Sequence, residues 1–298
     1  IKVDVISAVR IMGKGVFVML LGSIGVVFGG VMAYKLGQTL SLGNYFPLAQ
    51  DSWRAFGTLA GSWIGGTGNM TAAFAGLEGA PADPTMAAAA DQMVYLIWLP
   101  ILLGCKSFAD RFNRWARVPE GRLEAMESAA ANFKNTESPP TMTSLLYLAL
   151  LAVGFTWVAV GLSEVLPPIV VGGATVITAG TWLILLVTTM ALLASVTPAR
   201  KLPAAQPIAM AIIYIYVARV GATMDLSVVD WDKMIGFIAM AYVWIFIHGL
   251  FILTGAWIFR VDIHTVAIAS AANIGGAASA PIVAGYPRKT LLPSSILI

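Results

Sequence analysis

Two glycine-rich stretches in this sequence each hold several polar side chains that could bind a ligand inside a membrane. They are Gly61-Ser62-Trp63-Ile64-Gly65-Gly66-Thr67-Gly68-Asn69 and Ser270-Ala271-Ala272-Asn273-Ile274-Gly275-Gly276-Ala277-Ala278-Ser279. A shift of 210 positions lays Ile64-Gly65-Gly66 on Ile274-Gly275-Gly276 and Asn69 on Ser279. Hydroxyl and amide oxygens are hard ligands, which suit sodium better than a transition metal.

So many glycines favour an interruption in each of the two helices. In a helix interior each glycine costs about 1 kcal/mol relative to alanine. Unwound backbone is tolerated in a bilayer only where it is buried in protein or lines a wet cavity. Two interrupted helices facing each other would offer N–H groups to an anion and carbonyl oxygens to a cation. The alternative is close packing alone, because small residues let membrane helices touch.

Besides the two glycine-rich stretches, Asp91 is a third candidate for binding an ion or a proton. The uncharged run 92–105 is shorter than the ~20 residues that span a bilayer, so the helix must also include 87–90, which draws Asp91 into the membrane. Intramembrane carboxylates tend to mark ion or proton pathways. The alternatives are a wet vestibule or a cap on a neighbouring helix. We interpret His248 as a hydrogen-bonded core residue.

We therefore predict one site for a solute and an ion, built from hydroxyl, amide, carboxylate and glycine backbone groups. Its predicted members are Ser62, Gly65, Gly66, Thr67, Asn69, Asp91, Ser270, Asn273, Gly275, Gly276 and Ser279. Nothing in the sequence resembles a nucleophile with its base, an HExxH helix or a phosphate-binding loop. We expect no catalytic residue, no enzyme activity, no metal centre and no cofactor beyond Na⁺ or H⁺ as coupling ion.

The composition shows which elements must position these residues. Of the 298 residues 58% are hydrophobic and 11% are charged, whereas a soluble domain carries roughly 25% charged residues. Recurring apolar runs predict an all-α polytopic membrane protein with about eight spans. These lie near 16–34, 55–77, 85–108, 143–163, 175–195, 204–223, 234–259 and 265–285. A single cysteine excludes an intrachain disulfide.

The paired runs predict two internal repeats, 1–142 and 143–298. The first ends in a basic interfacial loop, 106–140, which is either a positive-inside loop or an anionic-lipid site. Eight spans would make both glycine-rich runs cross in the same direction, whereas inverted repeats require opposite directions. A parallel repeat and a re-entrant segment are both left open. The first residue is Ile and the last ones are apolar, so we expect further spans beyond both ends.

Charge counts predict an orientation for these spans. Lysines and arginines are more numerous in 35–54, 106–140, 200–201 and 260 than in 1–14, 78–90, 163–170, 223–233 and 286–290. The positive-inside rule therefore assigns the first set of segments to the cytoplasmic side and the second set to the outside.

The chain resembles the integral membrane family labelled domain of unknown function 819 over most of its length. The resemblance lies in 61–69, the alanine-rich run into Asp91, Val220-Gly221-Ala222-Thr223-Met224-Asp225-Leu226, His248 and 269–280. That family looks related to the cation/proton antiporter and anion transporter superfamily. The resemblance implies two discontinuous helices crossing near the midplane and a secondary transporter.

We thus expect an ion-coupled secondary transporter, symporter or antiporter, of a small solute such as an anion. The alternative is a non-transporting structural or assembly subunit of a larger membrane complex. The expected partners are the lipid bilayer and the solute, without nucleic acid, and a homodimer or a larger complex is left open. The location would be multi-pass in an inner, plasma or organelle membrane.

Overall fold

The computed structural model describes residues 12–42, 46–48, 52–77, 83–121, 139–171, 174–205, 207–209, 211–212, 215, 222 and 230–285. Most of the predicted span 204–223 and of the motif 220–226 lies outside these residues. By packing, the chain divides into two compact units. The smaller comprises Ile1–Val5, Ala75–Glu78 and Lys134–Met224, and the larger comprises Ile6–Phe74, Gly79–Phe133 and Asp225–Ile298. These units concern packing, so the repeats 1–142 and 143–298 stay a prediction.

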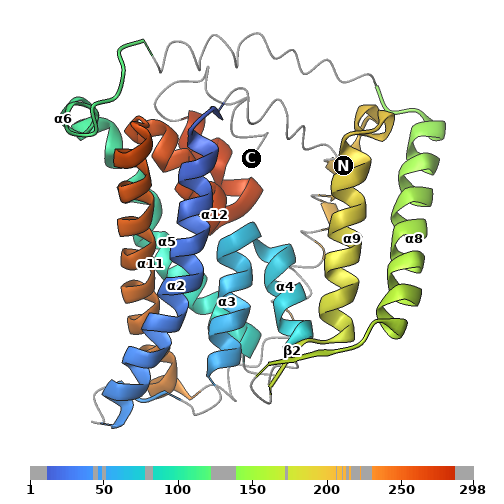
Figure 1. Ribbon diagram of the computed structural model, residues 1–298, viewed down its shortest axis with the longest axis horizontal. Helices are drawn as coiled ribbons and strands as arrows, with labels where there is room; N and C mark the ends of the chain where they lie inside the picture. Colours follow the sequence, from blue (N-terminus) through green and yellow to red (C-terminus); the bar gives the residue numbers. More distant parts are fainter. Residues whose placement is uncertain are drawn as a thin grey trace. The chain divides into compact units, whose positions relative to one another are not determined.

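The described residues of the larger unit are helical nearly throughout (Figure 1). Its elements are α2 (Gly15–Leu42), α3 (Trp53–Gly65), α4 (Thr67–Gly76, whose last residues belong to the smaller unit), α5 (Asp83–Gly104), η1 (Cys105–Phe108), α6 (Ala109–Trp115), α11 (Trp231–Phe259) and α12 (Ile263–Gly285).

Helices α2 and α11 pack closely along a glycine face. A Cβ atom placed on Gly25 would lie 2.6 Å from the Cβ of Phe251, and one on Gly29 would lie 2.6 Å from Cδ1 of Trp244. Because Gly25 and Gly29 stand one turn apart, the absence of side chains lets the two backbones approach. The Trp244 indole then donates a hydrogen bond of 2.6 Å to the carbonyl of Val26. The two backbones therefore pack closely along this glycine face.

Contacts along α11 set the directions of its neighbours. Gly255 lies against Leu21 and Gly37 lies against Met240, so α2 runs antiparallel to α11. Tyr242 donates to the carbonyl of Met93, and Trp98 lies on Gly249, so α5 runs parallel to α11. The start of α2 therefore shares one end of the larger unit with the ends of α5 and α11. We name this the basic end.

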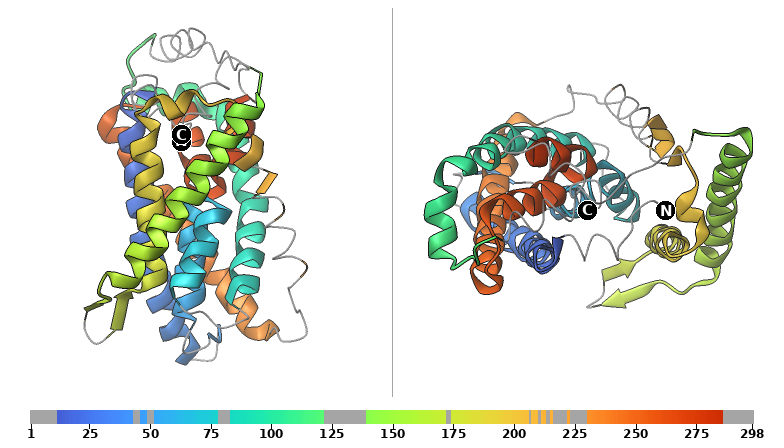
Figure 2. Two further views of the ribbon diagram at one scale, coloured as in Figure 1. Left: turned by 90° about the vertical axis from the view of Figure 1, so that its right-hand side faces the viewer. Right: turned by 90° about the horizontal axis from the view of Figure 1, so that it is seen from above.

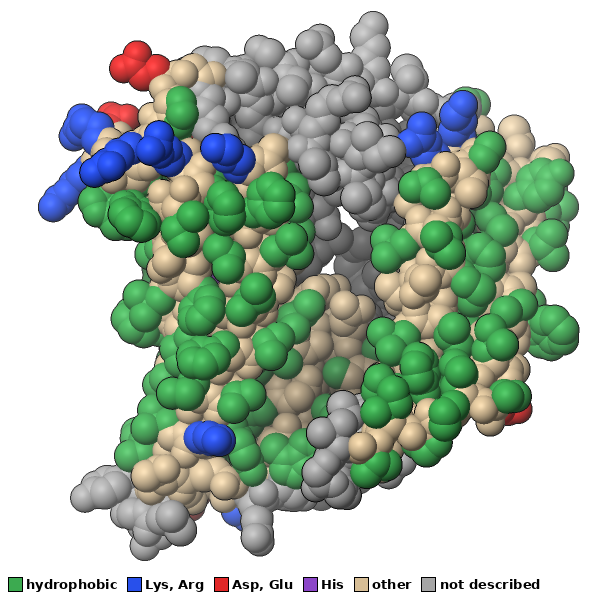
Figure 3. All heavy atoms as spheres, viewed as in Figure 1, with side chains coloured by type: hydrophobic (Ala, Val, Ile, Leu, Met, Phe, Trp, Pro, Cys, Tyr) green, Lys and Arg blue, Asp and Glu red, His purple; other side chains and the backbone are tan. Residues whose placement is uncertain are grey.

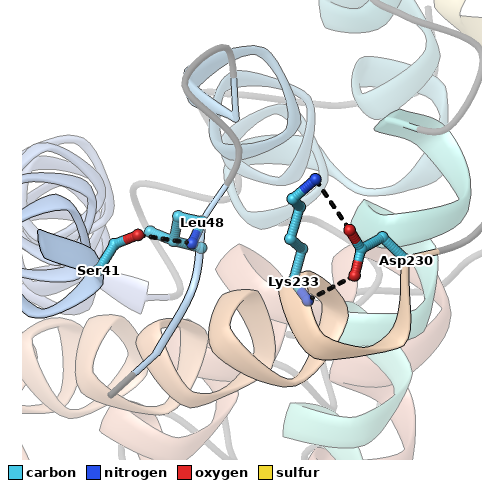
Figure 4. Close-up of polar contacts among 4 residues, drawn as sticks. All are labelled: Ser41, Leu48, Asp230 and Lys233. Atoms are coloured by element: carbon cyan, nitrogen blue, oxygen red, sulfur yellow. Dashed lines mark hydrogen bonds and ion pairs between the residues drawn. The ribbon is translucent and has the colours of Figure 1, made fainter. Parts of the chain in front are cut away.

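The opposite end holds the end of α2 and the start of α11 (Figure 4). The hydroxyl of Ser41 accepts a hydrogen bond of 3.1 Å from the backbone N–H of Leu48. Asp230 caps α11 by accepting a hydrogen bond from the backbone N–H of Lys233. The ammonium group of Lys233 also lies 2.8 Å from the carboxylate of Asp230. Hydrogen bonds from Lys233 hold the pKa of Asp230 below its usual range. The Asp230 cap closes the start of α11 outside its apolar segment.

Among the described residues of the larger unit, cations gather at the basic end. Six lie there, and three lie toward the other end: Lys14, Lys106, Arg111, Arg114, Arg117 and Arg260 against Lys35, Arg54 and Lys233. The charge count predicted 35–54 on one side with 106–140, and 1–14 on the other side. That grouping is wrong, because Lys14 and the segment after α5 share one end.

The smaller unit pairs two apolar helices through a short hairpin. Its elements are α8 (Met142–Val165), β1 (Ile169–Val171), β2 (Ala174–Ile177), α9 (Ala179–Ser195) and η2 (Pro198–Lys201). The two strands pair antiparallel, so the all-α prediction holds except for this hairpin, which takes the first residues of the predicted span 175–195. The hydroxyl of Thr178, the N-cap of α9, donates a hydrogen bond of 3.2 Å to the carbonyl of Gly76.

The described helices fit a membrane protein. Four are long and apolar enough to cross a bilayer: Gly15–Ser41, Thr85–Trp115, Met142–Val165 and Trp231–Phe259. Large apolar side chains face outward, such as Leu96 at 72% exposure and Trp157 at 77%. Apolar side chains cover much of the described surface in Figure 3. Within the described residues the predicted eight spans are thus not reached, and 55–77 is divided between α3 and α4.

Candidate functional site

The first glycine-rich run forms a helical hairpin, which we call the first hairpin (Trp53–Gly76). Helix α3 ends at Gly65, and Gly66 has φ +83° and ψ −171°. A Cβ atom placed on Gly61 would lie 2.8 Å from the Cβ of Ala73, although twelve residues of straight helix would separate them by about 18 Å. The chain therefore reverses at Gly66. The prediction of a span at 55–77 is wrong, because thirteen residues of α3 rise only about 20 Å.

The second run also turns back, although its helix is not unwound. Helix α12 is helical from Ile263 to Gly285, so the predicted interruption at Gly275 and Gly276 is not found. However, Ala267 and Val283 both line one small pocket, whereas a straight helix would hold them about 24 Å apart. The axis of α12 therefore folds back between them (Figure 2). We call Ile263–Gly285 the second hairpin.

The two hairpins share a local geometry at positions 210 residues apart. A Cβ atom on Gly65 would collide with the side-chain amide of Asn69, and one on Gly275 would collide with the hydroxyl of Ser279. In a regular helix, side chains four residues apart stand about 5–6 Å from each other at Cβ. Both glycines are thus needed so that the residue four positions on can fold over them. The limbs before them, Trp53–Gly65 and Ile263–Gly275, also correspond at the same shift.

The hairpins run in opposite directions within the larger unit. Phe56 packs on Phe237 and Trp63 packs on Trp244, so α3 runs parallel to α11. Thr265 lies against Gly15 at the start of α2, and Ser270 lies at His248, so the first limb of α12 runs antiparallel to α11. The second hairpin therefore starts at the basic end, and the first starts at the opposite end. With eight full spans, both glycine-rich runs would cross the membrane in the same direction, which inverted repeats do not allow. Because the first run turns back, it no longer counts as a crossing, and the two hairpins start from opposite ends.

Asp91 binds the first hairpin directly before its turn. Its Oδ2 accepts a hydrogen bond of 2.8 Å from the Ser62 hydroxyl, and its Oδ1 accepts one of 2.8 Å from the Trp63 indole. The carboxylate is half-buried, and no lysine or arginine among the described residues pairs with it. Ser62 and Asp91 were both predicted site residues, and the structure brings them together. Trp63 was not predicted, because tryptophan in an apolar run is usually packing.

One face of α5 touches both hairpins. Asp91, Tyr95 and Trp98 follow one another at spacings of four and three, which align side chains on one helix face. The Tyr95 ring comes within 3.1 Å of a Cβ position on Gly275. Its buried hydroxyl lies near the Ser279 hydroxyl but makes no hydrogen bond of acceptable geometry with a described residue. Tyr95 and Trp98 were missed in the sequence, although their spacing from Asp91 was a usable signal.

Ser270 belongs to a buried chain of hydrogen bonds that links four helices. The Trp98 indole donates to the Ser270 hydroxyl over 3.0 Å, and the same hydroxyl lies 3.0 Å from Nε2 of His248. The Gly22 carbonyl can only accept, so Nδ1 of His248 carries the proton and donates to it over 3.0 Å. Nε2 of the neutral ring then accepts from Ser270. The interpretation of His248 as a hydrogen-bonded core residue is confirmed.

The remaining predicted residues do not converge on Asp91. Asn273 binds α2, donating to the carbonyl of Met19 over 3.0 Å and accepting from Ser23 over 3.3 Å. Ser279 donates to the carbonyl of Gly275, and Asn69 is exposed over Gly65. The side chain of Thr67 and the surroundings of Gly276 lie outside the described part. The predicted residues therefore lie in three separate polar clusters, around Asp91, Ser270 and Asn273, rather than in one ligand shell. No cluster of three or more His, Cys, Asp or Glu side chains occurs within the described ranges.

The comparison with family models decides the family. The model described as "Protein of unknown function (DUF819)" matches residues 1–298. The chain belongs to the DUF819 family. The resemblance seen in its glycine motifs is thereby confirmed over the whole chain. No curated protein and no solved structure matches this DUF819 member. Its activity must therefore be argued from the hairpins and Asp91.

Proposed function

We propose that this DUF819 protein is an ion-coupled secondary transporter of a small solute. One observation carries the proposal: Asp91, six residues after the start of the membrane-length helix Thr85–Trp115, accepts two hydrogen bonds from the first hairpin next to its turn. Ionised carboxylates are expensive in a bilayer and tend to mark ion or proton pathways. Asp91 would bind Na⁺ or H⁺ as the coupling ion. We propose no catalytic role, no resident metal and no other cofactor.

The paired hairpins support the proposal. Inverted repeats with helices that break near the midplane are a common plan of secondary transporters, in which helix ends and freed backbone groups bind solute and ion. Here α3 and the first limb of α12 start at opposite ends, correspond at a shift of 210 residues and are in contact. We propose that the segments around the two hairpins are inverted repeats and that the solute binds near Gly66 and Gly276, at the two turns.

Asp91 would couple ion binding to movement of the first hairpin. While the carboxylate is empty, its two oxygens hold Ser62 and Trp63 through the hydrogen bonds described above. A bound cation or proton would take up oxygen lone pairs and neutralise the charge, so that both bonds weaken. The first hairpin is then freer to shift along α5, while Tyr95 and Trp98 keep α5 in contact with the second hairpin.

Reconstitution into proteoliposomes tests the function. We expect a Na⁺ or H⁺ gradient to drive uptake of a member of a panel of small organic anions and neutral solutes. Asp91→Asn keeps the shape and one carbonyl acceptor and is expected to abolish the ion dependence. The matched control is Asp232→Asn, which neutralises an exposed carboxylate at the start of α11 and should leave uptake unchanged.

Two results would overturn the proposal. One is gradient-driven uptake that is unchanged in Asp91→Asn and is also unchanged in normally folded variants of Gly66, Asn69, Asn273 and Ser279. The other is a folded wild-type protein that moves no ion or solute and purifies in mild detergent with fixed partners. The second result would support the assembly subunit instead.

A further inference from the structure

The segment that follows α5 presents a cationic and aromatic surface at the basic end. Four of its basic side chains are exposed, and Arg260 at the end of α11 is exposed as well. We name this set the α6 surface: Lys106, Arg111, Arg114, Arg117 and Arg260, with the aromatic rings of Phe108 and Trp115. Phe108 and Trp115 are 46% and 57% exposed. Asp110 is the only carboxylate between 106 and 117, and Glu120 follows. A row of Lys and Arg side chains is visible there in Figure 3.

The other side of α6 is fixed to the protein. Ala109 and Ala116 are buried, and Asn113 is half-buried. The side-chain oxygen of Asn113 accepts a hydrogen bond of 3.1 Å from the backbone N–H of Ile263, the first residue of α12. At a helix start this N–H has no partner within its own helix. A side chain of α6 therefore caps the second hairpin at its first residue.

We infer that the α6 surface binds the headgroups of anionic lipids and that this binding steadies the start of the second hairpin. The surface begins directly after α5 and includes the last residues of the membrane-length segment Thr85–Trp115, at the level where aromatic rings and basic side chains meet the lipid headgroups. Clusters of Lys and Arg in this position attract anionic lipids, and each cation strengthens the attraction roughly fivefold. The Asn113 bond would then transmit the ordering of α6 to α12.

The first measurement is lipid retention by the full chain, which does not depend on any transport activity. Purified protein is mixed with phosphatidylglycerol or phosphatidylcholine, and retained lipids are counted by native mass spectrometry. We expect phosphatidylglycerol to be preferred and Arg111→Gln with Arg114→Gln to lower its affinity about fivefold for each arginine. The control, Lys35→Gln with Lys201→Gln, removes the same charge from exposed positions elsewhere. Equal retention of both lipids, or equal loss in both double variants, would overturn the inference.

The second measurement tests the link to α12. Hydrogen exchange of residues 263–275 is followed in nanodiscs of phosphatidylglycerol or phosphatidylcholine. We expect slower exchange in phosphatidylglycerol, and Asn113→Leu should remove this difference while lipid retention stays normal. Inorganic phosphate in phosphatidylcholine nanodiscs should give no protection. Protection by phosphate alone would show a free-anion site, and unchanged protection in Asn113→Leu would show that α6 does not act through the cap.

Discussion

At the scale of single residues, the polar side chains of the candidate site mainly form hydrogen bonds between helices. Ser270 is the clearest case, because its hydroxyl accepts from Trp98 and donates to His248. Hydrogen bonds between membrane helices are worth about 0.6 kcal/mol on average and up to about 1.7 kcal/mol. Residues in the glycine motifs that are ligand candidates therefore also stabilise the fold. The stability of each variant must be measured before its transport activity is compared with that of the wild type.

Ser270→Ala is expected to lower the free energy of unfolding by about 1–2 kcal/mol, because two interhelical hydrogen bonds are lost. Ser163→Ala is the matched control, since the buried hydroxyl of Ser163 donates only to the carbonyl of Val160 in its own helix. Thermal unfolding in detergent measures both. If the two variants lose the same stability, the chain through Ser270 contributes nothing beyond an ordinary buried hydroxyl.

At the scale of helices, the reversal at Gly66 depends on one backbone conformation. Its φ of +83° with ψ near −171° lies in a region that only glycine occupies without strain. We expect Gly66→Ala to cost about 1–3 kcal/mol and to open the first hairpin. Gly154→Ala in α8 provides the contrast, because a Cβ there meets nothing within 4 Å and alanine favours a helix.

The same thermal unfolding assay separates the two variants. Gly154→Ala should unfold at the wild-type temperature or higher, and Gly66→Ala should unfold clearly below it. Equal stability of Gly66→Ala and wild type would mean that the turn tolerates a side chain and that the positive φ is not required.

The sequence allowed the position of Asp91 inside a long apolar helix and the correspondence at 210 residues to be predicted. It did not show that the first run turns back, because glycine content indicates a weak point in a helix but not the direction taken after it. That direction follows from tertiary contacts, such as Ala73 against Gly61. Trp63 and Tyr95 were missed for a similar reason: each looks like apolar packing until a partner from another helix is placed beside it.

At the scale of the whole molecule, the first hairpin changes the path of the chain through the membrane. If 55–77 crossed the bilayer, three crossings would separate Lys14 from Arg114. With a hairpin that returns to its own side, only α2 and α5 cross between them. We therefore predict that Lys14 and Arg114 face the same compartment and that Lys35 faces the other one.

Single cysteines at these three exposed positions decide between the two paths. The only native cysteine, Cys105, is buried and can be replaced by alanine. In sealed right-side-out vesicles, Lys14→Cys and Arg114→Cys should react alike with a membrane-impermeant maleimide, and Lys35→Cys should react oppositely. Permeabilised vesicles give the total reactivity of each cysteine. Arg114→Cys reacting together with Lys35→Cys would restore a full crossing at 55–77. The two hairpins would then no longer start from opposite sides, and the argument for inverted repeats would lose its basis.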